Sequence, residues 1–362
     1  MRDEACSYPL LNLAHADVDG NLTTAVFQVT IRAVLSANTV TTDWTFQPKS
    51  VPASMWPIEF PGLTVSCPDC SVVSGSGSGW GSTLPKWTSA ADPSATYHEV
   101  LSWDGGSAAD VNTTFHLSDA LNAQTALGGM DVNWTDNTEL SEIRCDTVLS
   151  GPPGKCVFDN YAPTYTLNAG KYPMPAAHAW LIQHKLPSHD GQPGEPGQAS
   201  PMYYLPGGDN GQGNNRDLIC PSGWAAAKGN PNATPAGITD TLSCDEYAFN
   251  ASYNSAGMPA SLGGLNAVGS GDECVQTYVT KVNNTTWHLY NDERDIDPTW
   301  TEKCGRSVMS SSQNSGVMSP FGGFITNMRL LKGDAYWMDP NLAADCSTDA
   351  LAVKCTMSAI LQ

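Results

Sequence analysis

The segment LSCDEYAFNAS holds the residues best suited to chemistry, because two carboxylates, Asp245 and Glu246, directly follow Cys244. Carboxylate oxygens are ligands of hard divalent cations, and a single carboxylate can also accept a proton from water. A solvated acidic turn would have the same sequence, however. The segment alone therefore favours a structural interpretation, and the functional one depends on what surrounds it.

Seven short blocks occur in a fixed order between Arg144 and Asp339. They are RCD, GKCVFDNYAPTY, YPMPAAHAW, NNRDLICPSGW, CDEYAFNASY, SQNSG and FGGFITNMRLLKGDAYWMD. Their order resembles that of the secreted NucA/NucB deoxyribonuclease family, particularly its long actinobacterial-type members. The resemblance covers roughly residues 144–340. It implies metal-dependent, largely sequence-nonspecific cleavage of extracellular DNA by a disulfide-stapled domain of the ββα-metal type.

The resemblance also implies a set of site residues. Asp245 and Glu246 match the carboxylates of the family's CDEYPFAS block, and His178 matches the histidine of YPE-A-HI. Asn314 matches an asparagine ahead of a glycine-containing helix, and Arg216 matches a basic residue of NRR. Each also has a structural interpretation: a histidine on an Ala-rich helix is usually hydrogen-bonded in the core, an asparagine in SSSQNSG usually caps a helix, and a lone arginine usually forms a surface ion pair.

Phosphodiester hydrolysis needs a nucleophile and compensation for the charge that develops on the phosphate. Oxygen ligands suit Mg²⁺ or Mn²⁺, which are the cofactors we expect. We expect Asp245 to be the general base for the attacking water, and Glu246 and the amide oxygen of Asn314 to hold the metal. The two carboxylates could exchange these roles. His178 or Arg216 would donate hydrogen bonds to the transition state.

The chain departs from the family pattern at several positions, one of which is Asn314-Ser315-Gly316, where the family has Asn-Arg-Gly-x-Gly. Four further departures are Met174 for the glutamate of YPE, Asp217 for an arginine of NRR, Ala248 for the proline after CDEY, and Asn250, which interrupts FAS. Lost cations matter because neutralisation of phosphates dominates non-specific DNA affinity. These departures favour an alternative: a catalytically weak or inactive extracellular structural or adhesive protein on the same scaffold. A glycan hydrolase is a third candidate, but its carboxyl groups lie roughly 5 to 9 Å apart, so adjacent acids would need a distant partner.

Local patterns predict the elements that position these residues. YPMPAAHAWLIQH, residues 172–184, begins with proline and places apolar residues at helical spacing, which predicts a helix carrying His178. A second helix is predicted within 310–331. Residues 187–215 are rich in Gly, Pro, Asn and Gln and are expected to form a long surface loop, a lid or an insertion.

The first third of the chain has a different pattern. AVFQVTIRAVL, GLTVSC, CSVVSG and YHEVLSW are short runs, the first alternating apolar and polar residues, and clusters of turn residues separate them. We therefore predict an α+β protein with an all-β, sandwich-like module over 1–140, of unknown role, and a nuclease-like domain over 141–362. The run SGSGSGWGS at 74–82 is expected to be a flexible loop.

Composition excludes several classes of function. Acidic residues outnumber basic ones by 36 to 17, for a formal charge of −19. This balance excludes a simple basic nucleic-acid coat and a polybasic membrane anchor. No apolar run approaches the ~18 residues of a spanning helix, so no membrane association is expected.

The 11 cysteines, together with sequons such as the one at Asn250, favour a secreted, glycosylated protein. The expected disulfides join neighbouring cysteines: 67 with 70, 145 with 156, 220 with 244, 274 with 304 and 346 with 355. Cys6 then remains as a free thiol or as the source of an interchain disulfide in a homo-oligomer. Under the structural alternative, the Trp-rich first module would bind a glycan or another protein chain.

Overall fold

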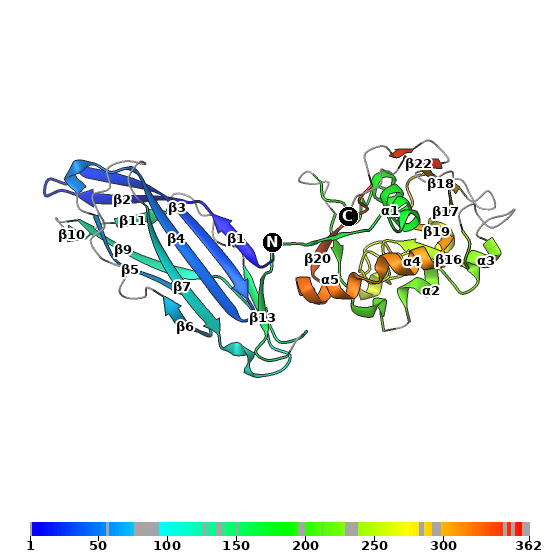
Figure 1. Cartoon of the computed structure of the whole chain (residues 1–362), viewed down its shortest axis with the longest axis horizontal. Helices are drawn as coiled ribbons and strands as arrows, with labels where there is room; N and C mark the ends of the chain where they lie inside the picture. The colour runs from blue at the N-terminus through cyan, green and yellow to red at the C-terminus, as the bar shows by residue number, and fades with distance from the viewer. Residues whose placement is uncertain are drawn as a thin grey trace. The chain divides into compact units, whose positions relative to one another are not determined.

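The computed structural model is an α+β protein in which strands predominate over a few helices. It forms two compact units, Met1–Tyr161 and Ala162–Gln362 (Figure 1). The structure describes residues 2–55, 58–75, 94–125, 128–129, 131–134, 140, 142–149, 151–194, 200–211, 213–228, 238–281, 286–291, 298–342, 346–348 and 352–356. Most of the predicted loop at 74–82 lies outside these residues.

The first unit is built from strands, as the alternating sequence pattern predicts. Its strands are β1 Glu4–Ser7, β2 Leu10–Ala16, β3 Leu22–Ser36, β4 Thr39–Ser50, β5 Ile58–Ser66, β6 Cys70–Gly75, β7 Ala95–Trp103, β8 Asn112–Phe115, β9 Ser118–Thr125, β10 Gly128–Gly129, β11 Asp131–Trp134, β12 Ile143–Asp146 and β13 Lys155–Phe158. The largest sheet has the order β11-β2-β3-β4-β7-β6, with β1 also paired to β3. Two three-stranded sheets, β10-β9-β5 and β13-β12-β8, complete the unit.

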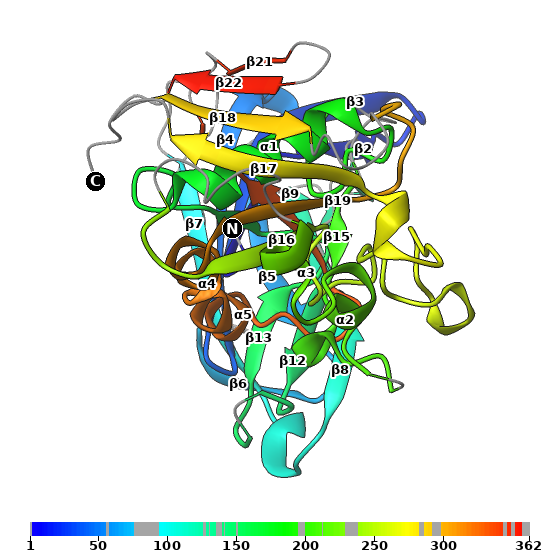
Figure 2. The ribbon, with the colours of Figure 1, turned by 90° about the vertical axis from the view of Figure 1, so that its right-hand side faces the viewer.

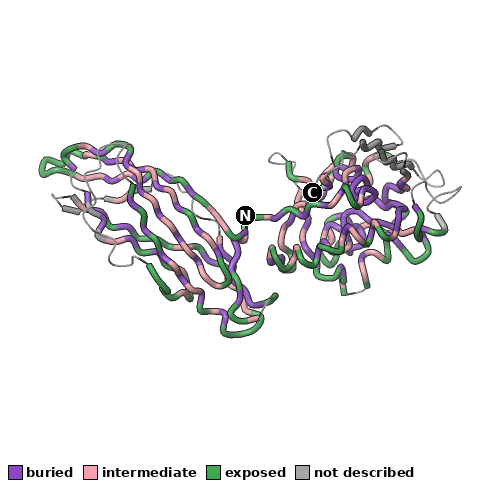
Figure 3. The backbone as a smooth tube through the Cα atoms, in the orientation of Figure 1, coloured by how far each residue is buried: buried purple, intermediate pink, exposed green. Residues whose placement is uncertain are grey.

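The core of the first unit lies between these sheets. Buried and more exposed residues alternate along β3 and β7, because successive side chains of a strand point to opposite faces (Figure 3). Phe27 of β3 meets Phe60 of β5 edge to face, with 5.9 Å between ring centroids. Ile143 and Phe158 of the third sheet belong to the same core.

The boundary between the units lies further along the chain than the sequence predicted. The hairpin β12–β13, which we expected to open the second domain at residue 141, belongs to the first unit. The reason is that Ile143 and Phe158 are buried in the first core, and β12 pairs with β8 as well as with β13. The RCD block and much of the GKCVFDNYAPTY block therefore lie in the first unit.

The second unit is built on a six-stranded sheet with the order β16-β19-β17-β18-β22-β21, which Figure 2 shows from β16 to β21. Its elements are β14 Thr164–Thr166, α1 Pro173–Lys185, β15 Met202–Tyr203, α2 Asn215–Ile219, α3 Trp224–Lys228, β16 Leu242–Tyr247, β17 Val275–Lys281, β18 Thr286–Asn291, β19 Gly305–Ser310, α4 Ser311–Met318, α5 Phe321–Met328, β20 Ala335–Asp339, β21 Cys346–Thr348 and β22 Ala352–Thr356. A small sheet, β14-β20-β15, lies beside it in the same unit. Because β16 stands first in the order of the six-stranded sheet, it is an edge strand of that sheet.

The helix predicted at 172–184 is confirmed as α1, which packs against the main sheet and against α4. The helix predicted within 310–331 is instead two helices, α4 and α5. They are separated at Pro320, which has no amide hydrogen with which to continue a helix.

The segment 187–215 is not purely the surface loop that its composition predicted. Asp190 is buried, and its carboxylate accepts hydrogen bonds from the Nδ2 atoms of Asn254 and Asn266, each at 2.7 Å. Met202, in β15, is fully buried, and β15 pairs with β20. The described part of this segment is therefore anchored to the body of the second unit.

Four of the five predicted disulfides are confirmed: Cys67–Cys70, Cys145–Cys156, Cys220–Cys244 and Cys274–Cys304. The side chains of Cys346 and Cys355 lie outside the described part of the chain, although their backbones are opposite each other in β21 and β22. Cys6 is free and exposed. Within the described ranges, no helix is both long and apolar enough to cross a membrane.

Candidate active site

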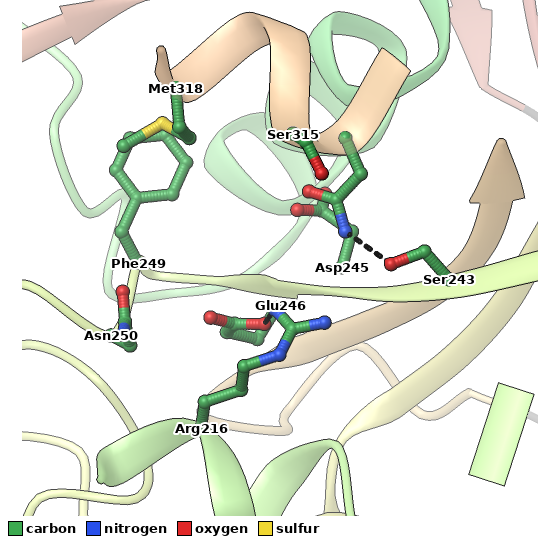
Figure 4. Close-up of a pocket in the computed structure, with 9 residues that line it drawn as sticks. Arg216, Ser243, Asp245, Glu246, Phe249, Asn250, Ser315 and Met318 are labelled. Carbon is green, nitrogen blue, oxygen red and sulfur yellow. Dashed lines mark hydrogen bonds and ion pairs between the residues drawn. The ribbon is translucent and has the colours of Figure 1, made fainter. Parts of the chain in front are cut away.

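A pocket of about 350 Å³ lies along the free edge of β16 (Figure 4). We call it the acidic pocket. Its lining residues are Arg216, Ser243, Asp245, Glu246, Phe249, Asn250, Asn314, Ser315 and Met318. Four of the five residues that the sequence singled out therefore lie in one cavity.

The open edge of β16 brings these residues together. The carbonyl oxygen of Cys244 accepts a hydrogen bond from Nδ2 of Asn314 at 2.9 Å and another from the guanidinium of Arg216. Asn314 belongs to α4 and Arg216 to α2, so one carbonyl on the edge strand joins both helices to it. Nδ2 of Asn314 also donates to the hydroxyl of Ser243 at 3.0 Å. Because both its protons are used, the amide oxygen of Asn314 is the atom left for a ligand.

The carboxylate of Asp245 is hydrogen-bonded to His178, which lies outside the pocket. Nδ1 of His178 lies 2.7 Å from Oδ2 of Asp245, and the imidazole is fully buried in the middle of α1. Nε2 has no hydrogen-bond partner among the described residues. A buried N–H without a partner is costly, so we assign the proton to Nδ1, which donates it to Asp245. His178 does not line the pocket, and its contact with the site is through this carboxylate.

The side chains of Glu246 and Arg216 are in contact at the pocket. The guanidinium contacts Oε2 of Glu246 and the Cys244 carbonyl, and the Arg216 side chain remains 34% exposed. Burial raises the pKa of Glu246 to about 8; the Arg216 charge opposes this rise, and the nearby Asp245 adds to it. Without a further cation, Glu246 is therefore largely protonated at neutral pH.

The raised pKa of Glu246 predicts that metal-free protein loses stability as the pH increases. The unfolded chain releases this proton near the ordinary pKa of 4.5, whereas the folded chain keeps it until about pH 8, so the unfolded state is favoured progressively over that interval. Relative to Glu246→Gln, the free energy of unfolding of the wild type should fall by about 4 to 5 kcal/mol between about pH 4 and about pH 9. Urea titrations in EDTA at both pH values measure this difference. An unchanged difference would contradict the assignment.

The sequence missed several residues of the pocket wall. Phe249 lies in the same block as Asp245, and Met318 follows Asn314 by four residues, a spacing that places two side chains on one face of a helix. That spacing was the available signal for Met318. Ser243 and Ser315 are neighbours of predicted residues but carry no motif of their own.

The pocket contains some, but not all, of the oxygen ligands that a hard cation needs. Among the described residues, no group of three or more His, Cys, Asp and Glu side chains is arranged to hold a metal. The pocket instead offers two carboxylates and one amide oxygen, from Asp245, Glu246 and Asn314. Such a set fits Mg²⁺ or Mn²⁺, because Mg²⁺ commonly binds through one or two carboxylates and keeps several waters.

Comparison of the chain with family models, with curated proteins and with solved structures found no match. The residues of the acidic pocket and their geometry are therefore what bears on function.

Proposed function

We propose that the second unit is a metal-dependent endonuclease that hydrolyses extracellular DNA without sequence preference. The observation that carries this proposal is the convergence of Asp245, Glu246, Asn314 and Arg216 in one pocket. These residues come from three elements, β16, α4 and α2. The strand β19 pairs antiparallel with β16 and runs directly into α4, so two strands and a helix meet at the pocket, an arrangement that supports a ββα-metal type of site.

In the proposed mechanism, Asp245 accepts the proton of the attacking water. His178 donates to one oxygen of this carboxylate and so fixes its orientation, which leaves the other oxygen for the water. In this mechanism His178 is a positioning residue. From the sequence, His178 or Arg216 was instead expected to donate hydrogen bonds to the transition state. A bound divalent cation would be held by Asn314 and deprotonated Glu246, and would supply charge compensation for the phosphate.

Arg216 is the cation that the chain itself supplies. Its guanidinium faces the pocket with a third of the side chain exposed, so it can donate to a phosphate oxygen once a substrate enters. The chain carries a formal charge of −19, which repels DNA. The positive charge of Arg216 and of the bound metal must overcome this repulsion. Cleavage is therefore expected to weaken strongly as salt concentration increases.

One observation favours the alternative of an inactive scaffold. Arg216 already contacts Glu246, so a metal ion would have to displace its guanidinium from this side chain. If that contact persists in solution, the pocket is closed to catalysis, and the protein would serve a structural or adhesive role outside the cell. Four disulfides stabilise such a scaffold whether or not it is catalytic.

The proposal is tested by removing and restoring the metal. Purified protein should nick supercoiled plasmid DNA with Mg²⁺ or Mn²⁺, should lose this activity in excess EDTA, and should regain it when the cation is added back. Gel densitometry at low salt measures the rate. The alanine variants Asp245→Ala and Glu246→Ala are the controls for contaminating nuclease, since a contaminant would cleave equally in all three preparations.

A further inference from the structure

The acidic pocket has an apolar wall that the cleavage of a phosphodiester does not itself require. Phe249 and Met318 both line the pocket, and Figure 4 shows them at its left, with Ser243 at its right. Phe249 follows β16 closely, and Met318 is the last residue of α4. The wall is therefore carried by the same two elements as Asp245 and Asn314.

The two side chains of this wall differ in mobility. The ring of Phe249 is held in place by edge-to-face contacts with Tyr247 and Phe321, at centroid distances of 5.5 and 6.5 Å. Met318 is only half-buried and unbranched, so its thioether can adapt to a ligand. The wall thus combines the rigid ring of Phe249 with the adaptable side chain of Met318.

We infer that this wall contacts the base of an unpaired nucleotide next to the cleaved phosphate, and that the enzyme therefore prefers single-stranded DNA. The inference rests on the proposed function. A phosphate beside Asp245, Asn314 and Arg216 brings its own sugar and base within reach of the wall. In a duplex the faces of the bases are covered by their neighbours, whereas an unpaired base can turn out and pack against an apolar side chain.

Two further observations agree with a single nucleotide as the occupant. The volume of about 350 Å³ lies at the lower end of the range for small-molecule sites and is too small for a double helix. Phe249 and Met318 offer no hydrogen-bonding groups that could distinguish one base from another. Contact with them is therefore compatible with cleavage that is independent of sequence.

The test compares cleavage of one oligonucleotide sequence as a single strand and as a duplex, at the same Mg²⁺ concentration. The wild type should have the higher kcat/KM on the single strand. Met318→Ala should lower that value by about 5- to 10-fold, mainly through KM, with little change on the duplex. Met318→Leu keeps an apolar side chain of similar size and should behave like the wild type.

Met328→Ala is the matched control. Met328 is also a half-buried methionine at the end of a helix, packed against the same core, but it does not line the pocket. Its replacement should leave both substrates unaffected. Equal changes on both substrates in Met318→Ala, or no change on either, would overturn the inference while leaving the nuclease proposal intact. Failure of the wild type to cleave either substrate would overturn both.

Discussion

Replacing Asp245 by asparagine is expected to slow DNA cleavage by about 10²- to 10⁴-fold without unfolding the protein. Asparagine has the same shape, and its side-chain oxygen can still accept the hydrogen bond from His178. It cannot accept a proton from water, however. Single-turnover cleavage at saturating Mg²⁺ measures the rate, and thermal unfolding shows whether the fold is kept.

The matched control for this variant is Asp217→Asn. Asp217 is exposed on α2 directly after Arg216 and does not line the pocket, so its replacement removes the same charge nearby. Its cleavage rate should stay within about twofold of the wild type, because surface substitutions away from a site have small effects. If both variants slow cleavage equally, the effect of Asp245→Asn reflects overall charge and the role of general base is wrong.

Removing the Cys220–Cys244 disulfide is expected to lower both the stability of the protein and its rate of cleavage. Replacing both cysteines by alanine opens a loop with a sequence separation of 24 residues. The free energy of unfolding should fall by about 3 kcal/mol. Cleavage should also slow, because Cys220 ends the helix that carries Arg216 and Cys244 directly precedes Asp245. Urea unfolding and plasmid cleavage measure the two effects.

The Cys67–Cys70 disulfide provides the comparison. It closes a separation of only 3 residues and lies in the first unit. The same double replacement there should lower stability by roughly 1–2 kcal/mol and leave cleavage unchanged. If loss of Cys220–Cys244 leaves cleavage at the wild-type rate, the disulfide does not hold the acidic pocket in shape.

Features determined by nearby residues could be predicted from the sequence. The strand pattern of residues 25–35 and 97–103 needs only alternation, and it is observed in β3 and β7. The helix carrying His178 needs only a proline start and helical spacing. Cys145 and Cys156 flank a Pro-Pro-Gly turn, so a hairpin brings them together before any tertiary contact is formed.

Features that depend on distant pairing could not be predicted. Adjacent residues of a strand point to opposite faces, so the sequence did not explain how Asp245 and Glu246 could share a pocket. They do so because β16 is an edge strand, a fact that depends on its pairing with β19, more than fifty residues later. The domain boundary was misplaced for a similar reason, since the pairing of β12 with β8 is not visible in local composition.

The claim that the acidic pocket takes a divalent cation is tested most directly by counting bound Mn²⁺ ions. Electron paramagnetic resonance measures the free ion during a titration of the wild type and of Glu246→Gln at the same pH. We predict that the wild type binds about one more Mn²⁺ per chain than the variant, and that DNA cleavage appears over the same range of Mn²⁺ concentration. Identical binding by the two proteins would show that Glu246 holds no cation and would contradict the proposed site.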